Sequence, residues 1–363
     1  MIDVPPDYRP NRALHPGRFL KDQLAHFGMS QRELAERMER PPQVINQITR
    51  EKKSITPETA LGIEKVLGID AQFWINLQAV HDLVVARMEE DEKLELQRHW
   101  LKKIPDRKIA EFGWIERHDR VSERLRELLK FFGTPSLESL QPTTEVVGFR
   151  ITEKAKVNEW ALRAWLRRGE IEAREVEVAG YDEQRFRDAV KEIRSLTLED
   201  PSEYWSKMRG LCAAAGVVLL GVPHLPKTGA NGVTRWLSPK VAIIQLNLRY
   251  GTADIFWFTF FHEAGHVLQH ETKRTFVDLK GEERRNPDED EADAFARESL
   301  ITRDEWEPFV TNGDFSSSSI RSFASSQELH PGIVVGRLQR EGQLPYNQRN
   351  TLKQRLKFVG VAS

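Results

Sequence analysis

The spacing of apolar residues changes along the chain and predicts different elements in its two ends. Between residues 14 and 80, apolar positions recur every three or four residues, as in helices with one buried face. Residues 84–210 keep this spacing, with breaks at Pro105, Gly180 and Pro201. From about residue 211, short uninterrupted apolar runs appear, which are typical of buried strands. The pattern predicts a mainly α, multidomain protein with a C-terminal α+β part.

The N-terminal residues contain clear start and stop signals for short helices. Ser30 and Glu33 form a capping box at the start of one helix. Two prolines at 41–42 end that helix and can occupy the first turn of the next. A third helix is expected over residues 56–68, from a Thr-Pro start to a glycine stop. A compact all-α domain is therefore predicted here.

The helix that follows residue 42 directs Val44, Ile45 and Ile48 to the core and leaves amide side chains outside. A short helix, a tight turn and a second helix with exposed amides are the layout of a helix-turn-helix. Amides can pair with adenine in the major groove, and basic side chains suit phosphates. The residues predicted to contact a double-stranded DNA operator are Gln43, Asn46, Gln47, Arg50, Lys52 and Lys53.

Further signals in this domain are His15-Pro-Gly17 and the runs 29–37, 52–60 and 73–77. On these residues, the stretch 15–83 resembles the HigA-type antitoxins of the XRE helix-turn-helix class. Family members often have glycine where this chain has Glu39 and Glu51, which places negative charge near the DNA side. We expect a DNA-binding homodimer, because such proteins usually bind paired half-sites. The alternative is a helical bundle that serves dimerisation only.

Residues 262–266 read His-Glu-Ala-Gly-His and indicate a metal site. Two histidines four residues apart lie on one helix face, so His262 and His266 can bind one ion. Glu263 can then act as a base toward water at that metal. The preceding run, 255–261, is strongly apolar, so the helix is expected to be buried.

A third ligand is expected in residues 289–296, which look helical with small and aromatic residues on an inward stripe. The pattern Glu-x-x-small-Asp resembles the second metal helix of gluzincin peptidases. That resemblance implies that Glu289 is the third Zn²⁺ ligand and that Asp293 orients a ligand histidine. Glu291 is the competing ligand. It points about 200° away around the helix, so the two carboxylates cannot serve one ion equally well.

The residues after the motif indicate which class of zinc-peptidase site the sequence can form. A metzincin extension needs glycine at 269 and histidine at 272, where the chain has Gln269 and Thr272. His270 is expected to lie outside the ligand set, because two histidines and one carboxylate leave the open position that catalytic zinc needs. Tyr250 and His330 are the candidates for an additional donor to the substrate oxyanion.

Apolar runs predict strands at 216–220, 233–236 and 241–246, with a turn at residues 231–232. An edge strand in such a site can hold an extended peptide, and residues 241–246 are the expected edge. The runs 216–219, 222–226, 256–263, 289–296 and 331–338 carry a resemblance to a known family. On these runs, residues 211–345 resemble the ImmA/IrrE family of metallo-endopeptidases. The resemblance implies zinc-dependent cleavage of a partner protein, often a DNA-bound repressor, in a stress or mobile-element response.

Length and composition fit a globular protein with two or three domains, since 39% of the 363 residues are hydrophobic and 30% are charged. The expected domains are 1–83, a helical connection at 84–210, and 211–363. No apolar stretch reaches the roughly 18 residues that span a bilayer, and no signal core precedes the first domain. A single cysteine, Cys212, excludes an intrachain disulfide. We therefore expect a cytoplasmic protein without membrane contact.

The net charge of −1 gives no general signal for nucleic-acid binding, but one segment is locally basic. Residues 330–358, the basic stretch, carry six lysines and arginines against Glu341 alone. Such a stretch can contact an acidic partner, although a solvated helix face is the commoner role.

The preferred hypothesis is a transcriptional regulator with a zinc endopeptidase that cleaves a repressor or a toxin–antitoxin component. The alternative is a non-catalytic HigA-like antitoxin or autorepressor, whose zincin-like domain senses a ligand or binds a toxin. Glu263 favours the first hypothesis, because a structural metal site needs no base.

Overall fold

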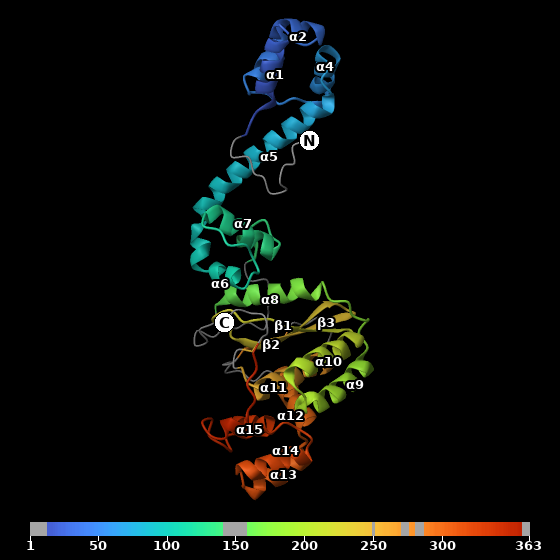
Figure 1. Cartoon of the computed structure of the whole chain (residues 1–363), viewed down its shortest axis with the longest axis vertical. Coiled ribbons are helices and arrows are strands. Elements are labelled where there is room, and N and C mark those ends of the chain that lie inside the picture. Colours follow the sequence, from blue (N-terminus) through green and yellow to red (C-terminus); the bar gives the residue numbers. More distant parts are fainter. Residues whose placement is uncertain (1–12, 141–157, 249–250, 270–275, 280–286, 358–363) are drawn as a thin grey trace. The chain divides into compact units, whose positions relative to one another are not determined.

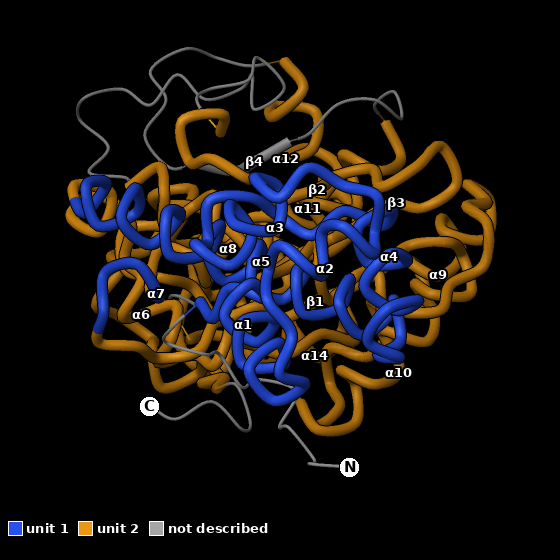
Figure 2. The backbone as a smooth tube through the Cα atoms, turned by 90° about the horizontal axis from the view of Figure 1, so that it is seen from above, with its two compact units in different colours: residues 1–98, 120–123 blue, residues 99–119, 124–363 orange. Residues whose placement is uncertain are grey.

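The computed structural model describes residues 13–140, 158–248, 251–269, 276–279 and 287–357. The chain divides into two compact units, which Figure 2 colours separately. Unit 1 comprises residues 1–98 and 120–123, and unit 2 comprises residues 99–119 and 124–363. The described elements are mostly helices, with a four-stranded sheet in unit 2. This confirms the expected fold class. Within the described ranges, no helix is long and apolar enough to cross a membrane.

The described part of unit 1 begins with four short helices and one long helix, whose ends follow the sequence signals. The hydroxyl of Ser30 accepts a hydrogen bond from the backbone N–H of Glu33 at 3.0 Å, and Gly68 ends its helix with φ of 70°. Leu34, Ile45 and Trp74 are among the fully buried side chains of its core. The helices are α1 (Pro16–His26), α2 (Gln31–Arg37), α3 (Pro42–Thr49), α4 (Pro57–Leu67) and α5 (Ala71–Leu96).

The long helices bear on the expected domain limits. Helix α5 runs for 26 residues and passes residue 83 without a break. Helix α10 (Pro201–Ala214) likewise spans residue 210. The limits 1–83, 84–210 and 211–363 stay predictions.

Unit 2 opens with helices, as expected for the middle of the chain. Arg124 donates to both carboxylate oxygens of Asp106, at 2.7 and 3.0 Å, and this buried pair joins α6 to α7. The elements are η1 (Arg98–Lys102), α6 (Asp106–Glu111), α7 (Val121–Phe132), η2 (Glu138–Leu140), α8 (Glu159–Ala173), α9 (Glu183–Ser195) and η4 (Leu196–Leu198), followed by α10.

The sheet has the strand order β1-β3-β2-β4. Its strands are β1 (Val217–Gly221), β2 (Ala230–Ser238), β3 (Val241–Leu246) and β4 (Phe276–Leu279). β1 is parallel to β3, whereas β2 is antiparallel to β3 and β4. Successive side chains point to opposite faces. Val218 and Leu220 therefore pack with α8, and Val217 and Leu219 with α10 and α11 (Ala253–Gln269) (Figure 1).

Two expectations about this sheet are wrong. Residues 241–246 do not form an edge, because β3 lies between β1 and β2; within the described chain, the edges are β1 and β4. The order of the strands along the chain makes β3 look like the last strand of the sheet. In the structure β1 pairs with β3, and β4, which the sequence does not predict, pairs with the other side of β2. Residues 231–232 are not a turn but lie inside β2. Glycine occurs there for space: a Cβ on Gly232 would lie 2.4 Å from Oε1 of Glu263.

The C-terminal helices complete unit 2 around α11. Almost every residue of α11 is buried, as its apolar sequence predicts. The elements after β4 are α12 (Pro287–Leu300), α13 (Arg303–Asn312), α14 (Ser317–Ser326), α15 (Pro331–Arg340) and η5 (Asn350–Leu352). Helices α12 and α15 both pack on α11, so the motif helix has neighbours that can add side chains to one site.

Candidate functional site

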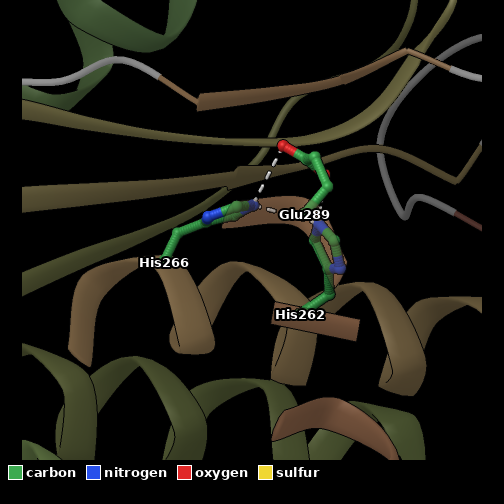
Figure 3. Close-up of side chains that lie close together, drawn as sticks. All are labelled: His262, His266 and Glu289. Atoms are coloured by element: carbon green, nitrogen blue, oxygen red, sulfur yellow. Dashed lines mark hydrogen bonds and ion pairs between the residues drawn. The ribbon is translucent and has the colours of Figure 1, made fainter. Parts of the chain in front are cut away.

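Helix α11 brings His262 and His266 to one face, one turn apart (Figure 3). Their Nε2 atoms lie 3.1 Å from each other. Both residues are buried, with 4% and 1% of their surface exposed. Two imidazoles whose Nε2 atoms converge inside a protein are typical of ligands to a shared ion.

Helix α12 supplies Glu289 to the same point (Figure 3). Its Oε2 lies 3.1 Å from Nε2 of His262, and its Oε1 lies 3.3 Å from Nε2 of His266. The helices can approach because residue 265 is glycine: a Cβ there would lie 3.2 Å from Cα of Ala292. Burial acts to raise the pKa of the Glu289 carboxyl, but hydrogen bonds and charge from the two histidines lower it to about 2.

These three residues, the ligand group, bring two nitrogens and a carboxylate to one point. Two ligand atoms that each lie about 2.0–2.1 Å from a zinc ion, at the tetrahedral angle, are about 3.3 Å apart. The two Nε2 atoms are 3.1 Å apart, and each lies near a different oxygen of Glu289, at 3.1 Å for His262 and 3.3 Å for His266. One ligand atom from each residue lies within 4.8 Å of the others, so the group can hold a metal ion, and its two nitrogens and one carboxylate suit zinc.

Asp293 lies one turn after Glu289 and contacts the other side of His262. Its Oδ1 is 2.9 Å from Nδ1 of His262. Arg340, from α15, donates to Oδ2 at 2.9 Å. Burial acts to raise the pKa of Asp293, but the hydrogen bond with His262 and the charge of Arg340 hold it below its usual value. A proton on Nδ1 directed at this carboxylate leaves Nε2 of His262 available to a metal.

Glu263 lies beside the ligand group and is fully buried. The hydroxyl of Thr234, on β2, lies 2.7 Å from its Oε2 and 2.9 Å from its backbone oxygen. Gly232 leaves the space that the carboxylate occupies. Strand β2 thus fixes the position of a carboxylate that can accept a proton near a metal.

The other described candidates do not belong to the ligand group. Glu291 is exposed and does not belong to the ligand group. His330 caps α15, where its Nδ1 accepts from the backbone N–H of Gly332 at 3.1 Å. Tyr250 and His270 lie outside the described residues. The metal and catalytic roles of the ligand group, Glu263 and Asp293 stay predictions.

Sequence reasoning missed three residues of this site. Thr234 carried no signal, and Arg340 was noted only as part of the basic stretch, because each comes from an element distant in the chain. Gly232 did carry one: a glycine inside a strand often marks a close approach of another group. It was assigned to a turn because asparagine precedes it.

In unit 1, the residues predicted to contact DNA lie on α3 and directly after it, and most of them are exposed. Gln43, Gln47, Arg50, Lys52 and Lys53 are exposed. Asn46 is half-buried, and its Nδ2 donates to Oε1 of Gln31 at 3.3 Å. Their contacts with DNA stay predictions.

Two glutamates of unit 1 adopt an unusual backbone conformation. Glu39 has φ of 52° and Glu51 has φ of 62°, in the left-handed region that glycine adopts without strain. Each residue directly follows the C-cap of its helix, where such a conformation is common. This explains why glycine suits these two positions.

Two family models match the chain, one in each unit. Residues 20–74 match a helix-turn-helix family, and residues 230–316 match the IrrE N-terminal-like domain of peptidase family M78. The second range contains Glu263 and the whole ligand group. The N-terminal match agrees with the predicted helix-turn-helix, and the C-terminal match agrees with the predicted ImmA/IrrE resemblance.

Among curated proteins, virulence-associated protein I of Dichelobacter nodosus is 36% identical over 89 residues, which are 24% of this chain and 82% of that protein. The uncharacterized HTH-type transcriptional regulator YddM of Escherichia coli K12 is 33% identical over 76 residues, 21% of this chain and 81% of that protein.

Among solved structures, a HigA-family addiction module antidote protein from Coxiella burnetii is 34% identical, with 23% of this chain and 92% of that chain covered and a TM-score of 0.22. The Pseudomonas aeruginosa antitoxin HigA, solved with the higBA promoter, is 31% identical, with 23% and 90% covered and a TM-score of 0.22.

Proposed function

Because the chain belongs to the helix-turn-helix family and carries an IrrE N-terminal-like domain, we propose that it is a DNA-binding regulator that also cleaves a partner protein. The observation that carries the peptidase half is the ligand group, whose donor atoms converge within 4.8 Å, next to the buried carboxylate of Glu263. A structural metal site needs no such base. The cleaved partner would be a repressor or a toxin–antitoxin component.

In this proposal His262, His266 and Glu289 hold a zinc ion. When bound, zinc supplies Lewis acidity that polarises the scissile carbonyl and makes water more acidic. Glu263 accepts the proton of the attacking water and passes it to the leaving amine. Asp293 keeps His262 oriented through its contact with Nδ1.

Strand β4 is our candidate for the edge that holds an extended peptide. Within the described residues β4 pairs only with β2, the strand that carries Gly232 and Thr234. A peptide could pair with its outer edge through backbone hydrogen bonds, two strand spacings (roughly 9.6 Å) from β2. β4 thus takes the role first predicted for residues 241–246.

Cleavage can be tested without knowing the partner. The zinc-loaded full chain is incubated with a denatured cell extract, and newly formed peptide N-termini are labelled and identified by mass spectrometry. We expect new termini with a recurrent sequence context, and their loss after 1,10-phenanthroline is added. New termini that persist with the chelator would contradict a zinc mechanism.

The second candidate is a non-catalytic antitoxin or autorepressor. The similarity to proteins described as antitoxins favours it. In that case the IrrE-like domain senses a ligand or binds a toxin. Specific operator binding, together with no new termini from any extract or from the neighbouring gene products, would support this candidate over the peptidase.

Removing a positive charge after α3 should weaken DNA binding, and removing a negative charge there should strengthen it. Lys52→Ala should make the dependence of log K on log salt less steep by about 1, because one phosphate contact is lost. Glu51→Gly should raise affinity about two- to fivefold, because it removes one exposed negative charge, worth up to about 1 kcal/mol. Glycine also adopts the φ of 62° without strain.

The measurement is fluorescence anisotropy across a salt series, with a DNA fragment that the wild-type protein selects from a random pool. Lys93→Ala, an exposed lysine on α5, serves as the matched control and should leave both quantities unchanged. An unchanged salt slope for Lys52→Ala would remove Lys52 from the predicted DNA surface.

A further inference from the structure

A pocket of about 370 Å³ opens beside His262 in unit 2. Its floor is apolar and includes Phe258 of α11 and Ile333 of α15. Four basic side chains line it against two acidic ones, and three of the four come from the basic stretch. The basic residues are Arg297, Arg337, Arg340 and Lys353, and the acidic residues are Asp254 and Glu341.

Two of the four cations are committed to internal partners. Lys353 is paired with Asp254 at 2.7 Å, and both side chains are almost fully buried. Arg337 donates to the backbone oxygen of Ile301 at 2.6 Å and to Glu341 at 2.9 Å, and it stacks on a tryptophan ring. These contacts hold the walls of the pocket together and neutralise both of its carboxylates.

The other two cations, the arginine pair (Arg297 and Arg340), line the pocket and are partly exposed. Their side chains are 38% and 50% exposed. Both guanidinium groups approach Oδ2 of Asp293, at 3.7 and 2.9 Å. One carboxylate thus balances two guanidinium groups, which leaves one positive charge and several N–H donors toward the pocket. Phe258 lies under Arg340, 4.3 Å from its Cζ, and restricts its orientation.

We propose that the arginine pair binds a carboxylate of the peptide substrate, so that the pocket selects an acidic residue or a chain end near the scissile bond. This inference rests on the proposed peptidase function. The planar guanidinium matches a carboxylate through paired hydrogen bonds. The apolar floor suits the methylene groups that precede such a carboxylate. His262 also lines the pocket, so a substrate carboxylate bound there would lie close to the scissile bond.

The first test is the cleavage specificity of the zinc-loaded full chain on peptides from a denatured proteome. We expect glutamate or aspartate at one fixed position about tenfold above the corresponding amides, the effect of one charge-assisted hydrogen bond. Arg297→Glu should abolish or reverse this preference toward lysine. It leaves Arg340 in place to hold Asp293.

Arg303→Glu is the matched control for charge reversal. Arg303 lies on α13, is 79% exposed, pairs with Glu307 and does not line the pocket. This variant should retain the wild-type preference. Efficient cleavage without any acidic preference would overturn the inference and leave the peptidase proposal intact.

The second test does not depend on cleavage. Saturation-transfer NMR compares three probes on the full chain in the presence of a chelator: N-acetyl-glutamyl amide, N-acetyl-glutamine and N-acetyl-glutaminyl amide. We expect a carboxylate probe to bind about tenfold better than the amide, and Arg297→Glu to remove that difference. The first probe represents a side-chain carboxylate and the second a chain end.

The two proposals fail in different ways. A carboxylate preference in a protein that never cleaves would support the pocket and contradict the peptidase. Equal binding of the three probes would overturn the pocket, whatever the outcome of the cleavage assay.

Discussion

Glu263→Gln should abolish turnover and leave zinc binding unchanged. We expect the cleavage rate to fall about 10²- to 10⁴-fold, the usual contribution of a general base. Glutamine has nearly the same shape, so it fits the space beside Gly232 and can still accept from Thr234. The zinc content should stay at the wild-type value, because Glu263 is not in the ligand group. The measurement pairs initial rates on a peptide found in the proteome digest with elemental analysis.

The matched control is Glu291→Gln, which removes the same charge from an exposed position on α12. It should cleave at the wild-type rate. If Glu263→Gln also cleaves normally, the proton must be accepted by another group and the assigned mechanism is wrong. If both variants lose activity and zinc together, the lost activity reflects weaker metal binding, and Glu291 must be considered a zinc ligand.

The local chemistry of this site could be predicted from the sequence because it follows from spacing within single helices. His262 and His266 are four residues apart on α11, and Glu289 and Asp293 are four apart on α12. A helix fixes which side chains share a face, so each pair was predictable. The buried character of α11 followed from the same pattern, since its apolar run has no polar side until the motif begins.

What joins the two helices to the sheet could not be predicted. Gly232 and Thr234 reach Glu263 only because β2 pairs with β3 and β4 in one register, and no local pattern fixes the order of strands in space. For the same reason, the sequence wrongly predicts residues 241–246 (β3) as an edge strand. Arg340 reaches Asp293 from 47 residues further along the chain, through the packing of α15 on α11.

Zinc binding offers the second large effect, and it decides between the two carboxylates of α12. We expect about one zinc per chain in wild-type protein purified without chelator, and an affinity at least about 100-fold lower in Glu289→Ala, since even residues that only orient a ligand contribute 10- to 100-fold. Zinc should also raise the melting temperature of the wild type, since a ligand at 100 times its Kd stabilises by about 2.7 kcal/mol. This shift should be absent from Glu289→Ala.

Glu291→Ala is the control that makes this result specific. Glu289 lies 3.1 and 3.3 Å from the two histidines, whereas Glu291 is exposed on another side of α12. Glu291→Ala should therefore keep both the zinc and the thermal shift. The reverse pattern would make Glu291 the ligand, at a position that requires α12 to rotate. A wild-type chain that takes up no zinc even when it is supplied would contradict the peptidase and leave the DNA-binding regulator, because the base at Glu263 would then have no metal beside it.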